Sequence, residues 1–214
     1  MGKRRDSSSY LYHWVKCEDK GISEHQKIAR AIRVLANILC DTFLRSGESI
    51  EAKFGCSSIC FTESPLDFII DDKSKYQPVG IRFYKKDILR LGGLPVIYAS
   101  EEDSKLLPDI FIWRYVRFEP LLISEQRPFG IDFSWEREWR VDRKEINLLD
   151  DEFVLNSDYA TFESIIVPSD YFRDKLIHYM ERIFCQERAK YGDEFLEFHE
   201  DFIELVSSKI LIIS

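Results

Sequence analysis

The sequence predicts a single α+β domain, and three observations lead to that fold class. Short runs of aromatic and β-branched residues, separated by turn residues, are typical of β-strands and occupy most of residues 10–168. Amphipathic helical periodicity is concentrated in one early segment and in residues 169–214. The helices do not alternate strictly with the strands, which favours α+β over a doubly wound sheet. We therefore expect a disordered start over residues 1–9, and one domain over 10–214 with its core in 10–168 and a helical C-terminal extension.

Composition and charge are those of an ordinary globular chain with an acidic balance. Hydrophobic residues make up 45% of the 214 positions and charged residues 32%, which is enough to bury a full core. Thirty Lys and Arg against 38 Asp and Glu leave a formal charge of −8. Phosphate contacts need clustered cations, so an acidic chain is a poor non-specific nucleic-acid binder.

Cysteine usage and hydropathy predict a cytoplasmic protein. The five cysteines are odd in number and irregularly spaced, which favours free thiols in a reducing compartment. The basic run Lys3-Arg4-Arg5 is not followed by the apolar stretch of a signal peptide. No apolar run reaches the length of a membrane span, so we expect no membrane partner.

The first elements follow from strand composition and a helix-capping signal. Residues 10–15 are rich in aromatic and β-branched side chains and predict a strand. Ser23 with Gln26 three positions later is a capping box, which predicts a helix running to about Phe43. Its buried stripe is expected to be Ile28, Ile32, Leu35 and Leu39.

The middle of the chain predicts further short strands with two helical segments between them. We expect strands over residues 56–62, 79–83 and 95–98. Residues 85–91 predict one or two helical turns, closed by two glycines. Residues 108–117 predict a helix, because Pro108 suits a first helical turn.

The last part of the chain predicts two strands, two helices and a short return to the sheet. Strands are expected over residues 135–141 and 162–167. The amphipathic segments 170–185 and 194–206 predict helices. Residues 210–213 predict a last strand.

The segment 133–141, Phe-Ser-Trp-Glu-Arg-Glu-Trp-Arg-Val, carries the strongest chemical signal. On a strand, Glu136, Glu138 and Arg140 share one face, and the tryptophans share the other. An ordinary strand with a charged outer face explains the same pattern. However, neighbouring carboxylates disfavour each other's ionisation, and an arginine can hold one of them in place. Carboxylates so arranged suit stabilisation of a positively charged sugar carbon.

Metal and nucleotide-loop signatures are missing from the sequence. Cys56 and Cys60 are four residues apart with no second Cys/His pair to complete a zinc set, and the four histidines stand alone. There is no Gly-rich phosphate loop or dinucleotide fingerprint. We therefore expect no metal.

The order of three sequence blocks resembles the ADP-ribosyltransferase-fold family. Residues 11–14 (Leu-Tyr-His-Trp) resemble its first block, 57–63 (Ser-Ser-Ile-Cys-Phe-Thr-Glu) its second, and 136–138 (Glu-Arg-Glu) its third. Together with residues 80–83 and 93–98, the pattern is similar to DarT-like and AbiGi-like bacterial toxin or abortive-infection proteins. The resemblance implies a split β-sheet core with flanking helices.

The resemblance also implies a function and a set of site residues. It implies that NAD is the substrate, that Glu138 stabilises the oxocarbenium as nicotinamide leaves, and that Glu136 orients the acceptor. We therefore expect the strand with His13 to lie near the strand with Glu138, and both side chains to point into one cavity. The NAD-binding residues it implies lie in the first two blocks and on the strand at residue 98: His13, Trp14, Ser57, Ser58, Phe61, Thr62 and Tyr98. Taken alone, His13 is explained equally well as a core-strand histidine, and Ser58, Thr62, Phe61 and Tyr98 are explained better by strand hydroxyls or core packing.

Three functional hypotheses follow. The first is mono-ADP-ribosyl transfer from NAD to a macromolecular acceptor, protein or nucleic acid, in bacterial toxin or phage defence, with an antitoxin or phage protein as a further partner. The second is a non-catalytic binding module, an antitoxin or sensor, on the same fold. The third is a metal-dependent nuclease, which Glu51-Ala52-Lys53 with Asp67 would carry; the acidic charge disfavours it.

Overall fold

The structure is a computed structural model that describes residues 8–17, 19–47, 55–64, 66–67, 77–149, 159–193 and 196–213. It is a mixed α+β fold, as the sequence predicted, with a multi-stranded sheet and several helices. Most of the expected disordered start lies outside the described residues. Its last two residues, Ser8 and Ser9, are described, and the Ser9 carbonyl accepts a hydrogen bond from Lys85 N–H at 3.0 Å.

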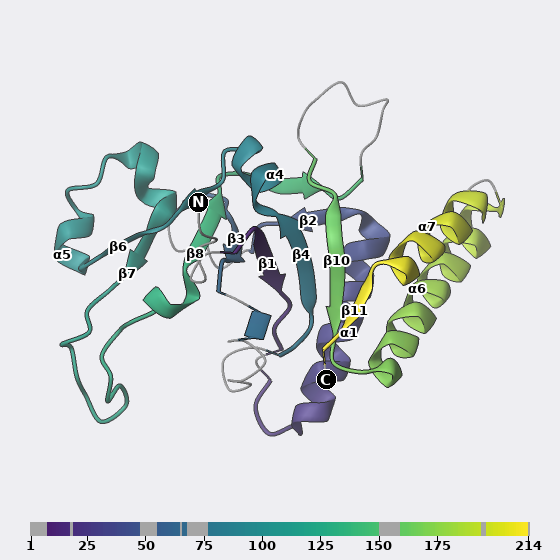
Figure 1. The fold of residues 1–214 in the computed structure, drawn as a ribbon, viewed down its shortest axis with the longest axis horizontal. Helices are drawn as coiled ribbons and strands as arrows, with labels where there is room; N and C mark the ends of the chain where they lie inside the picture. Colours follow the sequence, from purple (N-terminus) through teal and green to yellow (C-terminus); the bar gives the residue numbers. More distant parts are fainter. Residues whose placement is uncertain are drawn as a thin grey trace, which may run out of the picture.

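A seven-stranded sheet forms the centre of the described chain, in the order β11-β10-β4-β1-β3-β8-β5 (Figure 1). Neighbouring strands are antiparallel except β10 and β11. The bounds are β1 Tyr10–Trp14, β3 Ile59–Thr62, β4 Gly80–Tyr84, β5 Leu94–Pro95, β8 Glu138–Val141, β10 Phe162–Val167 and β11 Ile210–Ile212. β1 pairs with β4 along its whole length but shares a single residue pair with β3, Tyr12 with Thr62.

Two smaller sheets stand beside the main one. β2 (Phe43–Arg45) pairs antiparallel with β9 (Glu145–Asn147). β6 (Ile97–Ala99) pairs parallel with β7 (Tyr115–Arg117). The second pair lies beyond the β8 end of the main sheet (Figure 1).

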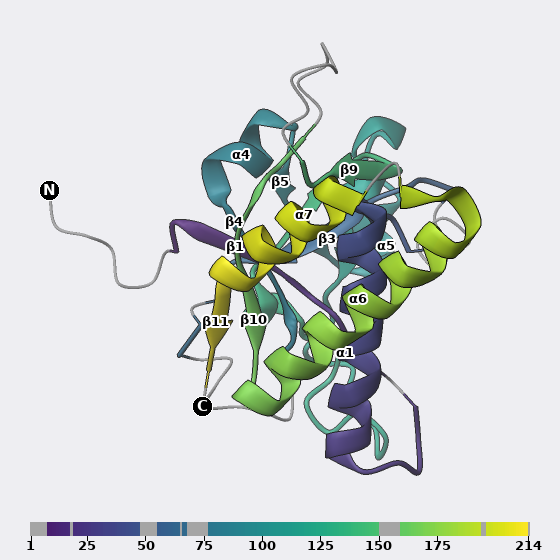
Figure 2. The same ribbon diagram turned by 90° about the vertical axis from the view of Figure 1, so that its right-hand side faces the viewer.

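The longest described helices cover one face of the sheet, as Figure 2 shows. They are α1 (Glu24–Asp41), α6 (Asp170–Tyr191) and α7 (Leu196–Ser208). Shorter helical segments are α4 (Lys85–Arg90), α5 (Glu101–Ser104) and the 3₁₀ turns η1 (Asp109–Arg114) and η2 (Ser134–Glu136). The prediction of helices over 170–185 and 194–206 is confirmed for the residues described, although α6 extends six residues further.

The capping box at Ser23 is confirmed as the start of α1. The Ser23 hydroxyl accepts from Gln26 N–H, and the Gln26 side chain accepts from Ser23 N–H at 2.9 Å. Of the expected stripe, Ile32, Leu35 and Leu39 are fully buried, and Ile28 is partly buried against the same core. Thr42 ends the helix in the left-handed conformation with φ 58°. Phe43, where the helix was expected to end, is instead the first residue of β2.

The two faces of the main sheet are packed differently. The helix-covered face carries the main core, which includes Leu11, Phe61, Ile81 and Trp139. The opposite face, here called the open face, carries a smaller cluster of Tyr12, Trp14 and Ile166, against which Trp135 packs. The tryptophans at 135 and 139, predicted to share one face, therefore lie on different faces.

Three predicted elements differ in kind from the observed ones. The strand expected over 95–98 is broken, because β5 ends at Pro95 in the main sheet and β6 begins at Ile97 in another sheet. Residues 108–117 are not one helix: η1 ends at Arg114 and the chain continues as β7. The strand predicted over 135–141 begins only at Glu138, because η2 precedes it and Arg137 takes a left-handed conformation with φ 46°. Ser64 holds this turn by donating to the Trp135 carbonyl at 2.6 Å.

Candidate functional site

The candidate site lies where the chain between β5 and β8 leaves the main sheet and returns to it. Residues 97–136, here called the lobe, contain β6, β7, α5, η1 and η2. Figure 1 shows the lobe beyond the β8 edge. It rejoins the sheet through Glu138, whose carbonyl accepts from Val96 N–H at 3.0 Å.

A cavity of about 470 Å³ lies between the lobe and β8. That volume is within the range of small-molecule sites. Its lining combines carboxylates, guanidinium groups and aromatic rings: Glu101, Tyr115, Val116, Arg117, Phe133, Glu136, Glu138 and Arg140. The two carboxylates that the sequence singled out, Glu136 and Glu138, both line this cavity, even though Glu136 is not on the strand.

Glu138 is held by a buried arginine. Arg140 Nε donates to Glu138 Oε1 at 2.7 Å, and both side chains are about one-tenth exposed. Burial alone would lower the pKa of Arg140, but the Glu138 carboxylate outweighs burial and the pKa is raised. The predicted sharing of one strand face by Glu138 and Arg140 is confirmed by the β3–β8 register.

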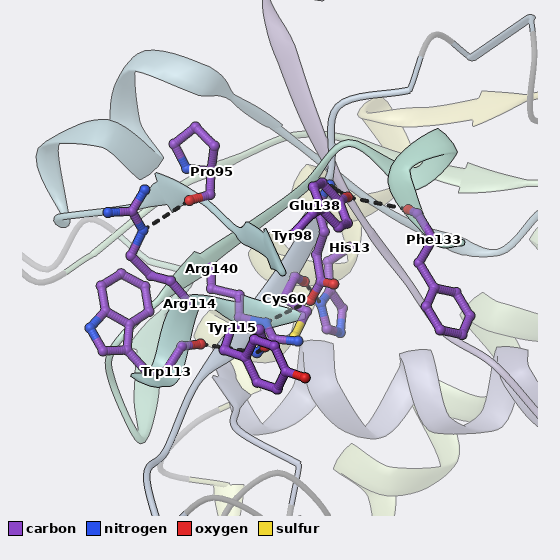
Figure 3. Close-up of polar contacts among 10 residues, drawn as sticks. All are labelled: His13, Cys60, Pro95, Tyr98, Trp113, Arg114, Tyr115, Phe133, Glu138 and Arg140. Carbon is purple, nitrogen blue, oxygen red and sulfur yellow. Dashed lines mark hydrogen bonds and ion pairs between the residues drawn. The ribbon is translucent and has the colours of Figure 1, made fainter. Parts of the chain in front are cut away.

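The same guanidinium joins the main sheet to the lobe. Arg140 Nη1 donates to the carbonyl oxygens of Trp113 at 2.9 Å and Tyr115 at 3.1 Å. These carbonyls lie at the end of η1 and the start of β7. Figure 3 shows the guanidinium between them and the Glu138 carboxylate. The position of Glu138 therefore depends on the docking of the lobe.

Tyr98 fixes the backbone of Glu138. Its hydroxyl accepts from Glu138 N–H and donates to the Phe133 carbonyl, both at 3.2 Å (Figure 3). Burial raises the pKa of Tyr98 to about 12. The hydroxyl therefore stays protonated near neutrality and bridges β8 to the segment before η2.

Cys60 lies beside the ion pair on the open face. It pairs with Arg140 across the β3–β8 ladder. Burial, with the nearby Glu138 carboxylate, raises the pKa of the Cys60 thiol to about 12. A thiol with such a pKa is not a nucleophile at neutral pH, so Cys60 contributes packing and polarity.

Three of the predicted site residues, Thr62, Tyr98 and Glu136, come together with Glu138. Thr62 lies directly opposite Glu138 in the β3–β8 ladder, and the Tyr98 hydroxyl accepts a hydrogen bond from the Glu138 backbone N–H. Glu136 reaches the cavity from η2. The carboxylate end of the expected site is therefore assembled by residues far apart in sequence.

The remaining predicted residues lie elsewhere. His13 pairs with Ile81 on β4, and the centroid of its ring lies 6.0 Å from the centroid of the Phe61 ring. Both side chains therefore lie on the helix-covered face. Trp14 is packed in the open-face cluster, stacked on Tyr12. The expectation that His13 and Glu138 point into one cavity is wrong, because the ladder places Tyr12, and not His13, in the row of Thr62 and Glu138.

Ser57 and Ser58 precede β3 and do not line the cavity. Ser58 is buried, and among the described residues its hydroxyl has no hydrogen-bond partner. A buried hydroxyl without a partner is costly. The structure assigns no ligand to it.

The sequence did not point to Glu101, Tyr115 or Arg117 as lining residues. Arg117 bridges to Glu101 at 3.0 Å and to Glu119 at 2.6 Å. No local pattern marks these positions, because β7 reaches β8 only through the folding of the lobe. The lining holds three carboxylates against two guanidinium groups, so it suits a cationic or neutral polar group better than a phosphate.

In the described part of the chain, no group of three or more His, Cys, Asp or Glu side chains could hold a metal ion. All five cysteines are free thiols. Of the nuclease pattern, Glu51, Ala52 and Lys53 lie outside the described residues, so that hypothesis stays untested.

Comparisons with known proteins return nothing: no family model, no curated protein and no solved structure matches the chain. Within the described residues, no helix is both long enough and apolar enough to cross a membrane.

Proposed function

We propose that the chain transfers ADP-ribose from NAD to a macromolecular acceptor, with Glu138 as the catalytic carboxylate. The observation that carries the proposal is a carboxylate fixed by a buried arginine at the wall of a cavity of ligand size. The sequence resemblance supplies the family, its split-sheet core and its setting in bacterial defence. The single residue pair between β1 and β3 is compatible with such a split.

The chemistry needs negative charge at a defined place. In the transfer, the bond between nicotinamide and the ribose C1′ breaks, and nicotinamide leaves with the electron pair. Positive charge builds on C1′ and the ring oxygen. Glu138 accepts a hydrogen bond from the ribose 2′-OH and stabilises that charge, a preorganised electrostatic effect. The acceptor then bonds to C1′ and gives up its proton to Glu136.

The acidic lining supports the same orientation of the substrate. The nicotinamide ring of NAD is a cation before it leaves, and a lining whose three carboxylates exceed its two guanidinium groups by one negative charge suits a flat cation beside exposed Phe133. Both guanidinium groups of the lining are already paired. The pyrophosphate therefore lies outside this cavity, with the nicotinamide riboside end inside.

The test is nicotinamide release and label transfer from NAD by wild type, Glu138→Gln, Glu136→Gln and the matched control Glu145→Gln, an exposed β9 glutamate. Glu138→Gln should lower release by about 10² to 10³, the usual loss for one preorganised group. NAD affinity should change far less, because ground-state contacts remain. Glu136→Gln should reduce label transfer more than release, and Glu145→Gln should reduce neither.

Two outcomes would decide against the assignment. Full turnover by Glu138→Gln would remove Glu138 from the catalytic role. A wild-type protein that consumes no NAD with any cell extract as acceptor would end the transferase proposal.

A non-catalytic binding module is the second candidate, and one observation favours it. His13 and Phe61, expected to bind NAD, lie on the helix-covered face and do not line the cavity. The module hypothesis predicts that NAD or a related ligand binds without being consumed. Calorimetry of wild type beside the release assay separates the two candidates.

A further inference from the structure

A projecting hairpin in the lobe has an unusual surface. Residues 119–131, here called the apolar hairpin, are closed at the base by two hydrogen bonds between Glu119 and Ile131 (2.8 and 2.9 Å). Two more join Ser124 and Arg127 near the tip, both 3.0 Å. Gly130 has φ +66°, and a Cβ there would meet the Pro120 carbonyl oxygen at 2.4 Å. The turn therefore needs glycine, and the hairpin has a specified shape.

The side chains of this hairpin are apolar and face solvent. Leu121 is 89% exposed, Phe129 85% and Ile123 65%, with Leu122 also exposed. Figure 1 shows the loop between β7 and η2 extending away from the sheet. Single exposed apolar side chains are ordinary, but a group on one short hairpin marks an interaction surface.

The charge around the hairpin selects among occupants. The lobe contains eight acidic and four basic residues, a formal charge of −4 and half the charge of the whole chain. Nucleic acid and anionic membranes both need clustered cations on the protein. A second copy would bring another acidic lobe against this one. A basic partner is attracted by the same field.

We propose that the apolar hairpin docks a protein segment that is basic and presents apolar side chains, such as an amphipathic helix rich in Leu and Lys. Leu121, Ile123 and Phe129 supply the apolar contact, and the acidic residues of the lobe attract the cationic rim. Phe133, two residues beyond the hairpin, lines the cavity. A docked segment therefore lies beside the cavity, but docking does not depend on chemistry within it.

The test uses labelled peptides and the full chain, with binding followed by fluorescence anisotropy. The probes are a helical Leu/Lys peptide, a Leu/Glu peptide of the same pattern and a Ser/Lys peptide. The variants are Leu121→Ser/Phe129→Ser and the control Leu89→Ser, an α4 residue that is 47% exposed. The Leu/Lys peptide should bind wild type and the control alike, and the hairpin variant at least about tenfold more weakly, because two large apolar contacts are lost.

The remaining outcomes overturn the proposal. If the Ser/Lys peptide binds as tightly as the Leu/Lys peptide, charge alone attracts the probe. If the Leu/Glu peptide binds as tightly as the Leu/Lys peptide, charge plays no part. Hairpin-dependent binding to phosphatidylserine vesicles or duplex DNA would assign the surface to those partners. A dimer in sedimentation velocity that the hairpin variant abolishes would assign it to a second copy. None of these measurements uses NAD, so their result is separate from the fate of the transferase proposal.

Discussion

The helix-covered side of the main sheet with α1, α6 and α7, here called the body, differs from the region where the lobe meets β8 in which side chains are buried. In the body, Ile32 and Leu35 are fully buried, while Arg45 and Asp41 form an ion pair that is more than half exposed. Around the lobe, the ion pair of Glu138 and Arg140 is buried, and Leu121 is exposed. The body is thus built for stability, and the lobe places charges and apolar groups where binding or chemistry would use them.

The difference also concerns how each region is held. The body is held by apolar area shared among three helices and a sheet, which tolerates the loss of any one polar contact. The lobe is tied to β8 by the directed hydrogen bonds of Arg140 and Tyr98. Removing a buried partner from such a network leaves a charge or a carbonyl unsatisfied. The predictions below test this contrast from the largest expected effect to the smallest.

Arg140→Met should be the most damaging single change. It leaves the Glu138 carboxylate buried without its partner and frees two carbonyls of the lobe. Breaking a buried pair in this way costs about 3–5 kcal/mol. Urea unfolding of the variant measures the loss.

Two controls sharpen that result. Arg45→Met breaks the exposed pair of the body and should cost less than about 1 kcal/mol. The double change Glu138→Leu/Arg140→Met removes both charges and should recover much of the stability. If the single and double variants are equally unstable, the loss comes from the two carbonyl hydrogen bonds of Arg140 and not from the unpaired Glu138 carboxylate.

Leu35→Ala tests the body by the same measurement. Leu35 lies on α1 and is fully buried in the main core. Its truncation should cost about 2–5 kcal/mol through lost burial and a residual cavity. Nicotinamide release per folded molecule should be unchanged, since no cavity residue moves. A selective loss of activity would mean that the body and the site are coupled.

The sequence was a better guide to the body than to the lobe, for a physical reason. The capping box at Ser23 and the stripe of α1 are local signals, since each depends on residues three or four positions apart. The β8 pair of Glu138 and Arg140 was also predictable, from strand alternation. The left-handed turn at Arg137 was not, because it is held by Ser64, which follows β3 and is distant in sequence.

The rest of the site escaped sequence reasoning because it is made by tertiary contacts. Arg140 binds carbonyls, which every residue carries, so no residue type announces Trp113 or Tyr115 as partners. The face of His13 is set by its register with β4. An alternating strand places every residue on one face or the other, and only the neighbour decides which.

His13 should give the body a measurable pH dependence. Burial lowers the pKa of His13, outweighing its hydrogen bond to the Cys60 carbonyl. The unfolded state then binds the proton more readily, so the stability contribution is complete above the ordinary histidine pKa and is lost as pH falls. Between about pH 7.5 and about pH 5.5, wild type should lose more stability than His13→Gln, whose amide can still donate to that carbonyl. If urea unfolding shows that wild type and His13→Gln lose the same stability over this pH range, the folded protein does not shield the His13 ring from water.

Leu121→Ser should have the smallest effect on stability, and it directly tests the contrast between apolar side chains buried in the body and apolar side chains exposed on the lobe. Leu121 is 89% exposed, so it buries almost no area on folding. Replacing such a side chain usually changes the free energy of unfolding by no more than about 0.5 kcal/mol. The comparison with Leu35→Ala holds the residue type constant and varies only the region. If urea unfolding shows that Leu121→Ser costs more than about 1 kcal/mol, the hairpin packs against the protein in solution, and the lobe does not present the apolar surface described above.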